Sequence, residues 1–156
     1  MFRHQTGLTL IEIMITLALL AIVLMIGVPS FQGFTETSRA RALTNDLTSA
    51  LQLARSEAIK TRSEMRVCPS VDQQTCSVTV DWSSGWILLD TTNNTLIRVW
   101  QAPSGANTLT GPNNGVRFRS NGMSSSETFN LVVGRCTREI ETGTTGRINF
   151  GELDCS

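Results

Sequence analysis

The chain has 156 residues, with 13 Lys plus Arg balanced by 13 Asp plus Glu. This balance excludes the overall basic surface typical of nucleic-acid-binding domains. The length allows one membrane helix and one modest domain, and no more.

The first element along the chain is a run of about twenty apolar residues between Gly7 and Pro29, interrupted by one charge, Glu12. A bilayer core needs about 20 apolar residues in a helix, so the run is long enough to span it. A secretory signal is a poor explanation, because its apolar region has about 7–15 residues and precedes an Ala-x-Ala-like site. A plain uncleaved anchor leaves Glu12 unexplained, since an acid inside a membrane span costs on the order of 3 kcal/mol.

A third explanation treats the start of the run as one motif, Gly7-Leu8-Thr9-Leu10-Ile11-Glu12. It resembles the processing motif of type IV prepilins. The resemblance implies that a prepilin peptidase removes residues 1–7 by cutting after Gly7 and methylates the new amine of Leu8. In a filament of packed helices, Glu12 of one subunit would pair with that amine of its neighbour, because an ion pair costs less to bury than either charge alone.

Location follows from the charges that flank the run. Arg3 and His4 lie on its short N-terminal side, and positive flanks remain cytoplasmic. We therefore expect a single-pass protein of the bacterial inner membrane with its C-terminal domain in the periplasm, found also in a pilus or pseudopilus. Residues 8–28 would form the membrane or filament-core helix.

Residues 29–62 change to an amphipathic pattern. Apolar residues recur at steps of three and four, as on one face of a helix: Leu43, Leu47, Ala50, Leu51, Ala54 and Ala58. Pro29 should kink or loosen the helix rather than end it, because the periodicity resumes beyond it. We expect one helix from Leu8 to about Lys60, and we count Pro29 with Glu12 as an assembly residue.

After Arg62 the pattern becomes strand-like, and turn residues separate the segments. The predicted strands are residues 65–68, 76–82, 86–90, 96–100, 116–120, 128–133, 137–141 and 147–150, with a loop over 101–115. The fold class is α+β: a long N-terminal helix packed on a small antiparallel β-sheet domain of residues 63–156.

Four cysteines fall in the part predicted to be exported, where disulfides persist. Three pairings are possible. We favour Cys68 with Cys76, which closes a short loop, and Cys136 with Cys155, which pins the C-terminal tail to a strand. Zinc is disfavoured because there is no Cys-x2-Cys pair and the only histidine lies in the leader.

Several pieces beyond the leader resemble the GspH/FimT family of type IV minor pilins and type II secretion pseudopilins. They occur in family order, from residues 53–59 through 67–70, 82–87, 118–122 and 128–131 to 145–148. The resemblance implies a type IV pilin-like fold. It also implies a low-abundance subunit that initiates, caps or regulates assembly of a pilus or pseudopilus, with other minor and major pilins or pseudopilins as partners.

The alternative function is DNA uptake for natural transformation, because some members of the family bind double-stranded DNA through a late Gly-Arg-x-Arg motif. Here Asn149 replaces the second arginine and Arg147 is the first. Four further arginines in the late strands could join them in a patch: Arg117, Arg119, Arg135 and Arg138. We favour a solvated strand face instead, because Glu127, Glu139 and Glu141 are interspersed.

Catalysis is not expected. The mature chain would have no histidine and has no tyrosine, so triads that use a histidine base are excluded. No Gly-rich phosphate loop precedes a Lys-Ser or Lys-Thr pair. We expect no catalytic residues, no metal and no cofactor.

Overall fold

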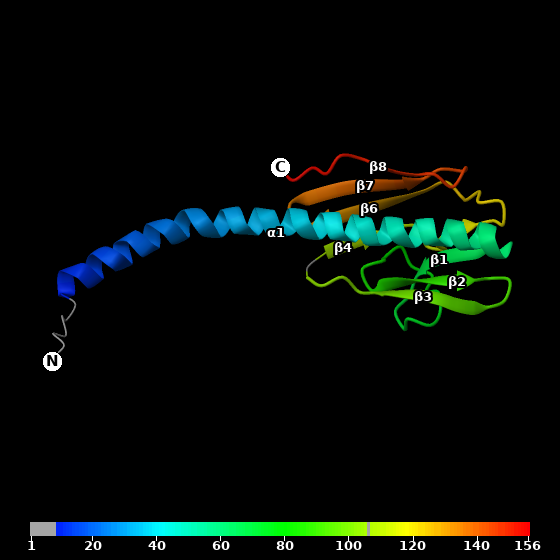
Figure 1. The fold of residues 1–156 in the computed structure, drawn as a ribbon, viewed down its shortest axis with the longest axis horizontal. Coiled ribbons are helices and arrows are strands. Elements are labelled where there is room, and N and C mark those ends of the chain that lie inside the picture. Colours follow the sequence, from blue (N-terminus) through cyan, green and yellow to red (C-terminus); the bar gives the residue numbers. More distant parts are fainter. Residues whose placement is uncertain (1–8, 106) are drawn as a thin grey trace, which may run out of the picture. The chain divides into compact units, whose positions relative to one another are not determined.

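The computed structural model describes residues 9–105 and 107–156, and for residues 26–30 it describes the backbone alone. The chain divides into two compact units, Met1–Thr35 and Glu36–Ser156. A single helix, α1, runs from Leu10 to Thr61 and contributes to both units (Figure 1). It continues past Pro29, as the periodicity predicted.

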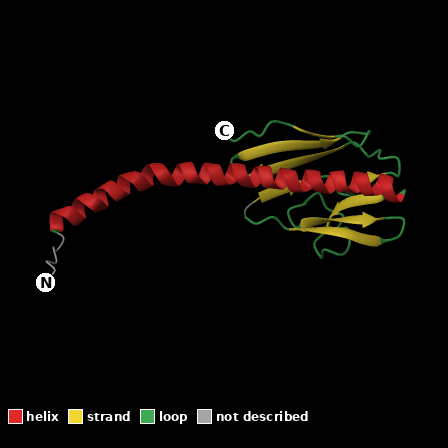
Figure 2. Ribbon diagram, in the orientation of Figure 1, coloured by secondary structure: helices red, strands yellow, loops and turns green. Residues whose placement is uncertain are grey.

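The described residues of the second unit form eight strands in two antiparallel sheets (Figure 2). The first sheet has the order β3-β2-β1-β5 and the second has the order β4-β6-β7-β8. The bounds are Met65–Pro69 for β1, Gly85–Asp90 for β2, Thr95–Gln101 for β3, Asn107–Thr110 for β4, Val116–Phe118 for β5, Glu127–Val133 for β6, Cys136–Thr142 for β7 and Ile148–Phe150 for β8.

The core lies between the second half of α1 and the two sheets. All six apolar helix residues predicted to form a stripe are buried, none more than 6% exposed. The sheets contribute mostly alternate residues, for example Phe129, Leu131 and Val133 of β6. This alternation is expected for strands with one face on the core. Trp82 and Trp86 are buried in the same cluster, and the ring of Trp82 meets that of Phe129 edge-on.

One predicted strand and one predicted loop were wrong. Residues 76–82 form no strand: Asp81 makes an isolated bridge to Thr110, and Val78 and Val80 are exposed. Within the predicted loop 101–115 the structure instead has β4. Its sequence, Asn-Thr-Leu-Thr, is mostly polar and buries only Leu109 well, so it carries a weak strand pattern.

The strands also divide into two sheets, where one antiparallel set was expected. Backbone hydrogen bonds join the segment before β2 to β4, from Trp82 N–H to the Leu109 carbonyl at 2.7 Å and from Gly111 N–H to the Val80 carbonyl at 2.9 Å. The segment 80–82 therefore covers one edge of the second sheet and connects the two sheets.

Candidate functional site

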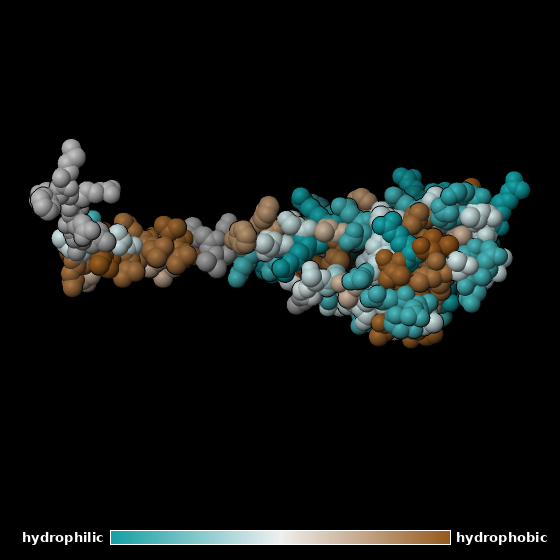
Figure 3. Space-filling model, turned by 60° about the horizontal axis from the view of Figure 1, so that its bottom comes forward, coloured by the Kyte–Doolittle hydropathy of each residue, from teal (hydrophilic) through white to brown (hydrophobic). Residues whose placement is uncertain are grey.

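The first part of α1 presents its apolar side chains outward. The large hydrophobic residues between Leu10 and Met25 are 46% to 80% exposed, and Figure 3 shows this stretch as a nearly continuous hydrophobic surface. Over the described residues, no helix reaches the length and apolar character required to cross a membrane.

Glu12 lies in the first turn of this exposed stretch. Its backbone N–H donates to Thr9, at 3.2 Å to the carbonyl and 3.4 Å to Oγ1. The Thr-x-x-Glu spacing is that of a capping box, a signal present in the sequence that we did not use. The Glu12 carboxylate is exposed and forms no ion pair with any described residue. Gly7 and Leu8, the predicted processing residues, lie outside the described residues.

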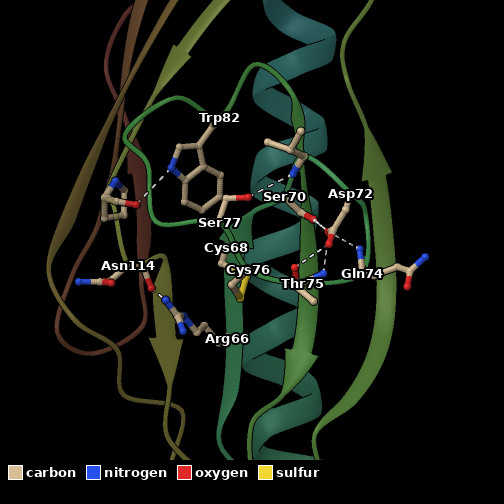
Figure 4. Close-up of a disulfide and its surroundings, with 12 residues drawn as sticks. Arg66, Cys68, Ser70, Asp72, Gln74, Thr75, Cys76, Ser77, Trp82 and Asn114 are labelled. Carbon is tan, nitrogen blue, oxygen red and sulfur yellow. Dashed lines mark hydrogen bonds between the residues drawn. A yellow bond between two sulfur atoms is a disulfide. The ribbon is translucent and has the colours of Figure 1, made fainter.

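The first disulfide joins Cys68 of β1 to Cys76 and closes a short loop (Figure 4). Asp72 organises this loop: it accepts hydrogen bonds from the hydroxyl and N–H of Thr75, the N–H of Gln74 and the hydroxyl of Ser70, at 2.7 to 3.0 Å. These donors, Thr75 first, hold the pKa of Asp72 well below its usual range. The loop is thus fixed by a covalent bond and a hydrogen-bonded turn.

The second disulfide joins Cys136 to Cys155 and fastens the C-terminal tail to the start of β7. The hydroxyl oxygen of Thr37 in α1 lies 3.8 Å and 3.7 Å from its two sulfurs. In the turn before Cys136, Arg135 donates its backbone N–H to the Glu36 carboxylate at 3.3 Å, and its Nε lies 3.7 Å from the same oxygen. The tail and this turn are both held against α1.

The structure disperses the five arginines considered for DNA binding. Arg117 and Arg119 line a cavity of about 500 Å³ together with Glu64 and Glu127, and Arg117 lies 3.8 Å from Glu64. Arg138 lies over the ring of Phe150, at 5.4 Å.

Arg135 and Arg147 are separated by the length of β7. Arg135 precedes its first residue, whereas Arg147 precedes β8, whose Ile148 pairs with the last residue of β7, Thr142. The five arginines thus lie on several separate surfaces of the described structure, and the solvated-face interpretation stays a prediction.

The position of the missing second arginine is acidic. Asn149 pairs in register with Glu141 and lines a cavity of about 280 Å³ with Glu139 and Glu141. Two carboxylates at this place oppose the approach of a phosphate.

One basic residue was missed by the sequence analysis as a site residue. Arg55 of α1, which lies outside the predicted apolar stripe, lines a cavity with Arg147. No local signal would have identified this pairing, because it depends on where the turn between β7 and β8 meets the helix.

Two family models match this chain. Residues 43–148 match the family described as type II transport protein GspH, and residues 2–28 match the prokaryotic N-terminal methylation motif. No curated protein matches the chain.

Three solved structures show the same fold. The type IV minor pilin FimU of Pseudomonas aeruginosa is 21% identical, with a TM-score of 0.62 over 79% of this chain and 98% of that one. A second crystal form of FimU gives 20% identity and a TM-score of 0.56, over 77% of this chain and 98% of that one. The minor pseudopilin EpsH of the Vibrio cholerae type 2 secretion system is 15% identical, with a TM-score of 0.52 over 72% of this chain and 95% of that one.

The family match covers well over half of the chain and includes α1 from Leu43 and every strand up to the start of β8. The N-terminal methylation motif precedes it. The chain therefore belongs to the GspH/FimT family of type IV minor pilins and type II secretion pseudopilins.

Proposed function

We propose that this chain is a low-abundance subunit that initiates, caps or regulates assembly of a pilus or a type II secretion pseudopilus. The observation that carries the proposal is the exposed apolar stretch of α1, whose first turn contains Glu12 without an ion-pair partner among the described residues. Fully burying one large aliphatic side chain contributes about 1.5–3 kcal/mol, so such a stretch strongly favours packing against other molecules.

In this proposal the exposed apolar stretch of α1 has two successive roles, first in the membrane and then in the filament. A prepilin peptidase first cuts after Gly7 and methylates Leu8, while the helix holds the subunit in the inner membrane. The subunit then moves into the filament, where Glu12 pairs with the terminal amine of an adjoining subunit. Opposite charges brought together in a water-poor helix bundle keep the cost of burying each of them low.

The second unit would select the neighbours. Its loop of residues 68–76 and its C-terminal tail are each closed by a disulfide, so they present surfaces of fixed shape. Preorganised surfaces lose less conformational entropy on binding than flexible ones. We propose other minor and major pilins or pseudopilins as the partners and a structural, non-catalytic role.

DNA uptake remains the alternative, and it has less support. Arg147 is present, but Asn149 faces Glu139 and Glu141, and the other four arginines are dispersed. In a gel-shift series with the full chain in detergent, we expect no shift of duplex DNA at low salt. Strong low-salt binding that is lost in Arg147→Ala would favour uptake instead, because phosphate contacts are strongly salt-dependent.

The main test of the assembly role is Glu12→Ala in the native host. We expect the variant in the membrane fraction but not in sheared filaments. Asp46→Ala is the matched control, because Asp46 is also an exposed acid on α1 but lies in the second unit. Normal incorporation of Glu12→Ala would contradict the proposed pairing.

Processing is tested separately by mass spectrometry of the protein from its native host. We expect a chain that begins at Leu8 and carries a methyl group on its amine. A chain that retains residues 1–7 without methylation would contradict the whole proposal.

A further inference from the structure

A cavity of about 470 Å³ lies between α1 and the turn that leads into β8. The helix lines it with Gln52, Arg55, Ser56 and Ile59, the turn with Gly146 and Arg147, and β8 with Ile148. Two guanidinium groups, an amide and a hydroxyl thus surround this cavity, and no carboxylate does. An arginine offers five N–H donors and no acceptor, so the lining is rich in hydrogen-bond donors.

Neither arginine forms an ion pair with another described residue. Three ion pairs connect described residues, and they use Lys60, Arg117 and Arg135 as their cations. Arg55 and Arg147 therefore both carry a positive charge into the same cavity without an acidic partner among the described residues. Two like charges from separate elements repel unless an anion lies between them.

Two glycine turns leave room for the Arg55 side chain. A side chain on Gly146 (φ 72°) would collide with the carbonyl oxygen of Gly122 and would lie 3.0 Å from Nε of Arg55. A side chain on Gly122 (φ 77°) would lie 3.4 Å from the same Nε. The guanidinium of Arg55 thus lies beside two glycines whose backbone is in the left-handed region, where any other residue would be strained.

We propose that this cavity binds the carboxylate of an acidic side chain presented by an adjoining subunit of the filament. The inference rests on the proposed function and names a contact that the second unit makes there. Arginine binds carboxylates through paired N–H donors, and such charge-assisted bonds are among the strongest hydrogen bonds in proteins. Ile59 and Ile148 complete the lining with apolar surface suited to the methylene stem of a Glu or Asp.

A single carboxylate fits the surroundings better than a nucleic-acid backbone. The cavity offers two cations, and Asn149, two residues after Arg147, lines a separate cavity with Glu139 and Glu141. Duplex DNA carries one charge per about 1.7 Å of its axis, so it would need a longer row of cations than these two. One carboxylate from a partner protein needs only the two arginines.

The test is site-specific photo-crosslinking in the native host, with p-benzoylphenylalanine in place of Gln52 in the full chain. We expect a crosslink from sheared filaments to a filament subunit, mapped by mass spectrometry to a segment containing an Asp or Glu. Arg147→Glu should lower its yield about tenfold or more, because like charges facing each other across an interface cost several kcal/mol. Replacing the mapped acid with Lys should restore the yield in the Arg147→Glu background.

Arg41→Glu is the control, since Arg41 is an exposed arginine on α1 that does not line the cavity. Incorporation into filaments shows that each variant folds, and Arg147→Gln provides a milder second variant. Three results would overturn the inference: no crosslink from incorporated subunits, a crosslink indifferent to Arg147→Glu, or duplex DNA binding that depends on Arg55 and Arg147. Absence of the unsubstituted chain from filaments would instead overturn the proposed function.

Discussion

The two ends of α1 use similar residues in opposite ways. Between Leu10 and Met25 the apolar side chains are exposed, and the only charge in that stretch has no ion-pair partner among the described residues. Between Ala40 and Ala58, small and aliphatic residues recur on one face and are buried against two sheets. The described residues therefore bury the apolar face of the second part of α1 and leave the first part exposed.

This difference indicates where each part gains its stability. A helix in water is stabilised mostly by packing of an apolar face, and the second half of α1 has that packing within the chain. The first half has none in the described structure, and in the proposed function lipid or other subunits supply it. Residues of the second half should thus control folding, and residues of the first half should control assembly.

Alanine substitutions in the two parts of α1 should differ strongly in their effect on the free energy of unfolding. Leu51→Ala should lower the free energy of unfolding by about 2–5 kcal/mol, because Leu51 is fully buried and the change leaves a cavity. Leu17→Ala, at a residue 59% exposed, should change it by less than about 0.5 kcal/mol. Urea unfolding of the full chain in detergent, followed by fluorescence of the buried tryptophans, measures both.

The reverse order is expected for assembly, where Leu17→Ala should reduce recovery in sheared filaments. A Leu17→Ala variant that unfolds as easily as Leu51→Ala would show that the first part of the helix is packed within its own chain. The division between the two halves would then be wrong.

Periodicity was sufficient to predict the helix because each signal is local. The apolar stripe, the continuation past Pro29 and an end near Thr61 all follow from residues within a few turns of one another. The division into two sheets did not follow, because β4 pairs with β6, about twenty residues away, and carries a weak strand pattern. Long-range pairing of this kind leaves little trace in a short segment.

The two disulfides of the second unit should contribute different amounts to its stability. Replacing Cys136 and Cys155 together with Ser should cost about 3 kcal/mol, since the bridge closes a loop with a sequence separation of 19. The bridge between Cys68 and Cys76, with a separation of 8, should contribute about 2.5 kcal/mol. Thr37 contacts the Cys136–Cys155 bridge, so loss of that bridge should also loosen the tail from α1.

Unfolding of both double variants and hydrogen exchange at residues 151–156 are the measurements. Faster exchange of the tail is expected in the Cys136→Ser/Cys155→Ser variant alone. If the Cys68→Ser/Cys76→Ser variant is the less stable of the two, loop length does not set the order. The packing of the first loop over β2 would then be the dominant contribution.

Candidate site residues were predictable only where one segment contains the whole signal. The Gly7 to Glu12 motif and the four cysteines are of this kind. Arg55 is not, because its neighbour in the cavity, Arg147, is 92 positions later in the chain (147 − 55). Helical spacing places Arg55 on an exposed face but does not show which turn covers it.

Two acids show a similar contrast between the exposed first part of α1 and the second unit. Glu12 has no ion-pair partner among the described residues, whereas Asp72 receives four hydrogen bonds from its own loop. The four donors favour the charged form of Asp72 and lower its pKa in the folded protein. Its charge is therefore used within the fold, whereas that of Glu12 is available to a partner.

The weakest of these effects is a pH dependence of the free energy of unfolding, which tests whether the charge of Asp72 stabilises the fold. Because the folded-state pKa of Asp72 is lowered, its stabilisation is fully present above the unfolded value of about 4 and decreases as the pH falls below it. The stability difference between the natural chain and Asp72→Asn should therefore shrink between about pH 5 and pH 2. Asp81→Asn is the control, since the Asp81 carboxylate accepts one hydrogen bond, from Ser83. An Asp72→Asn difference that stays constant with pH would mean that geometry, and not charge, gives this loop its stability.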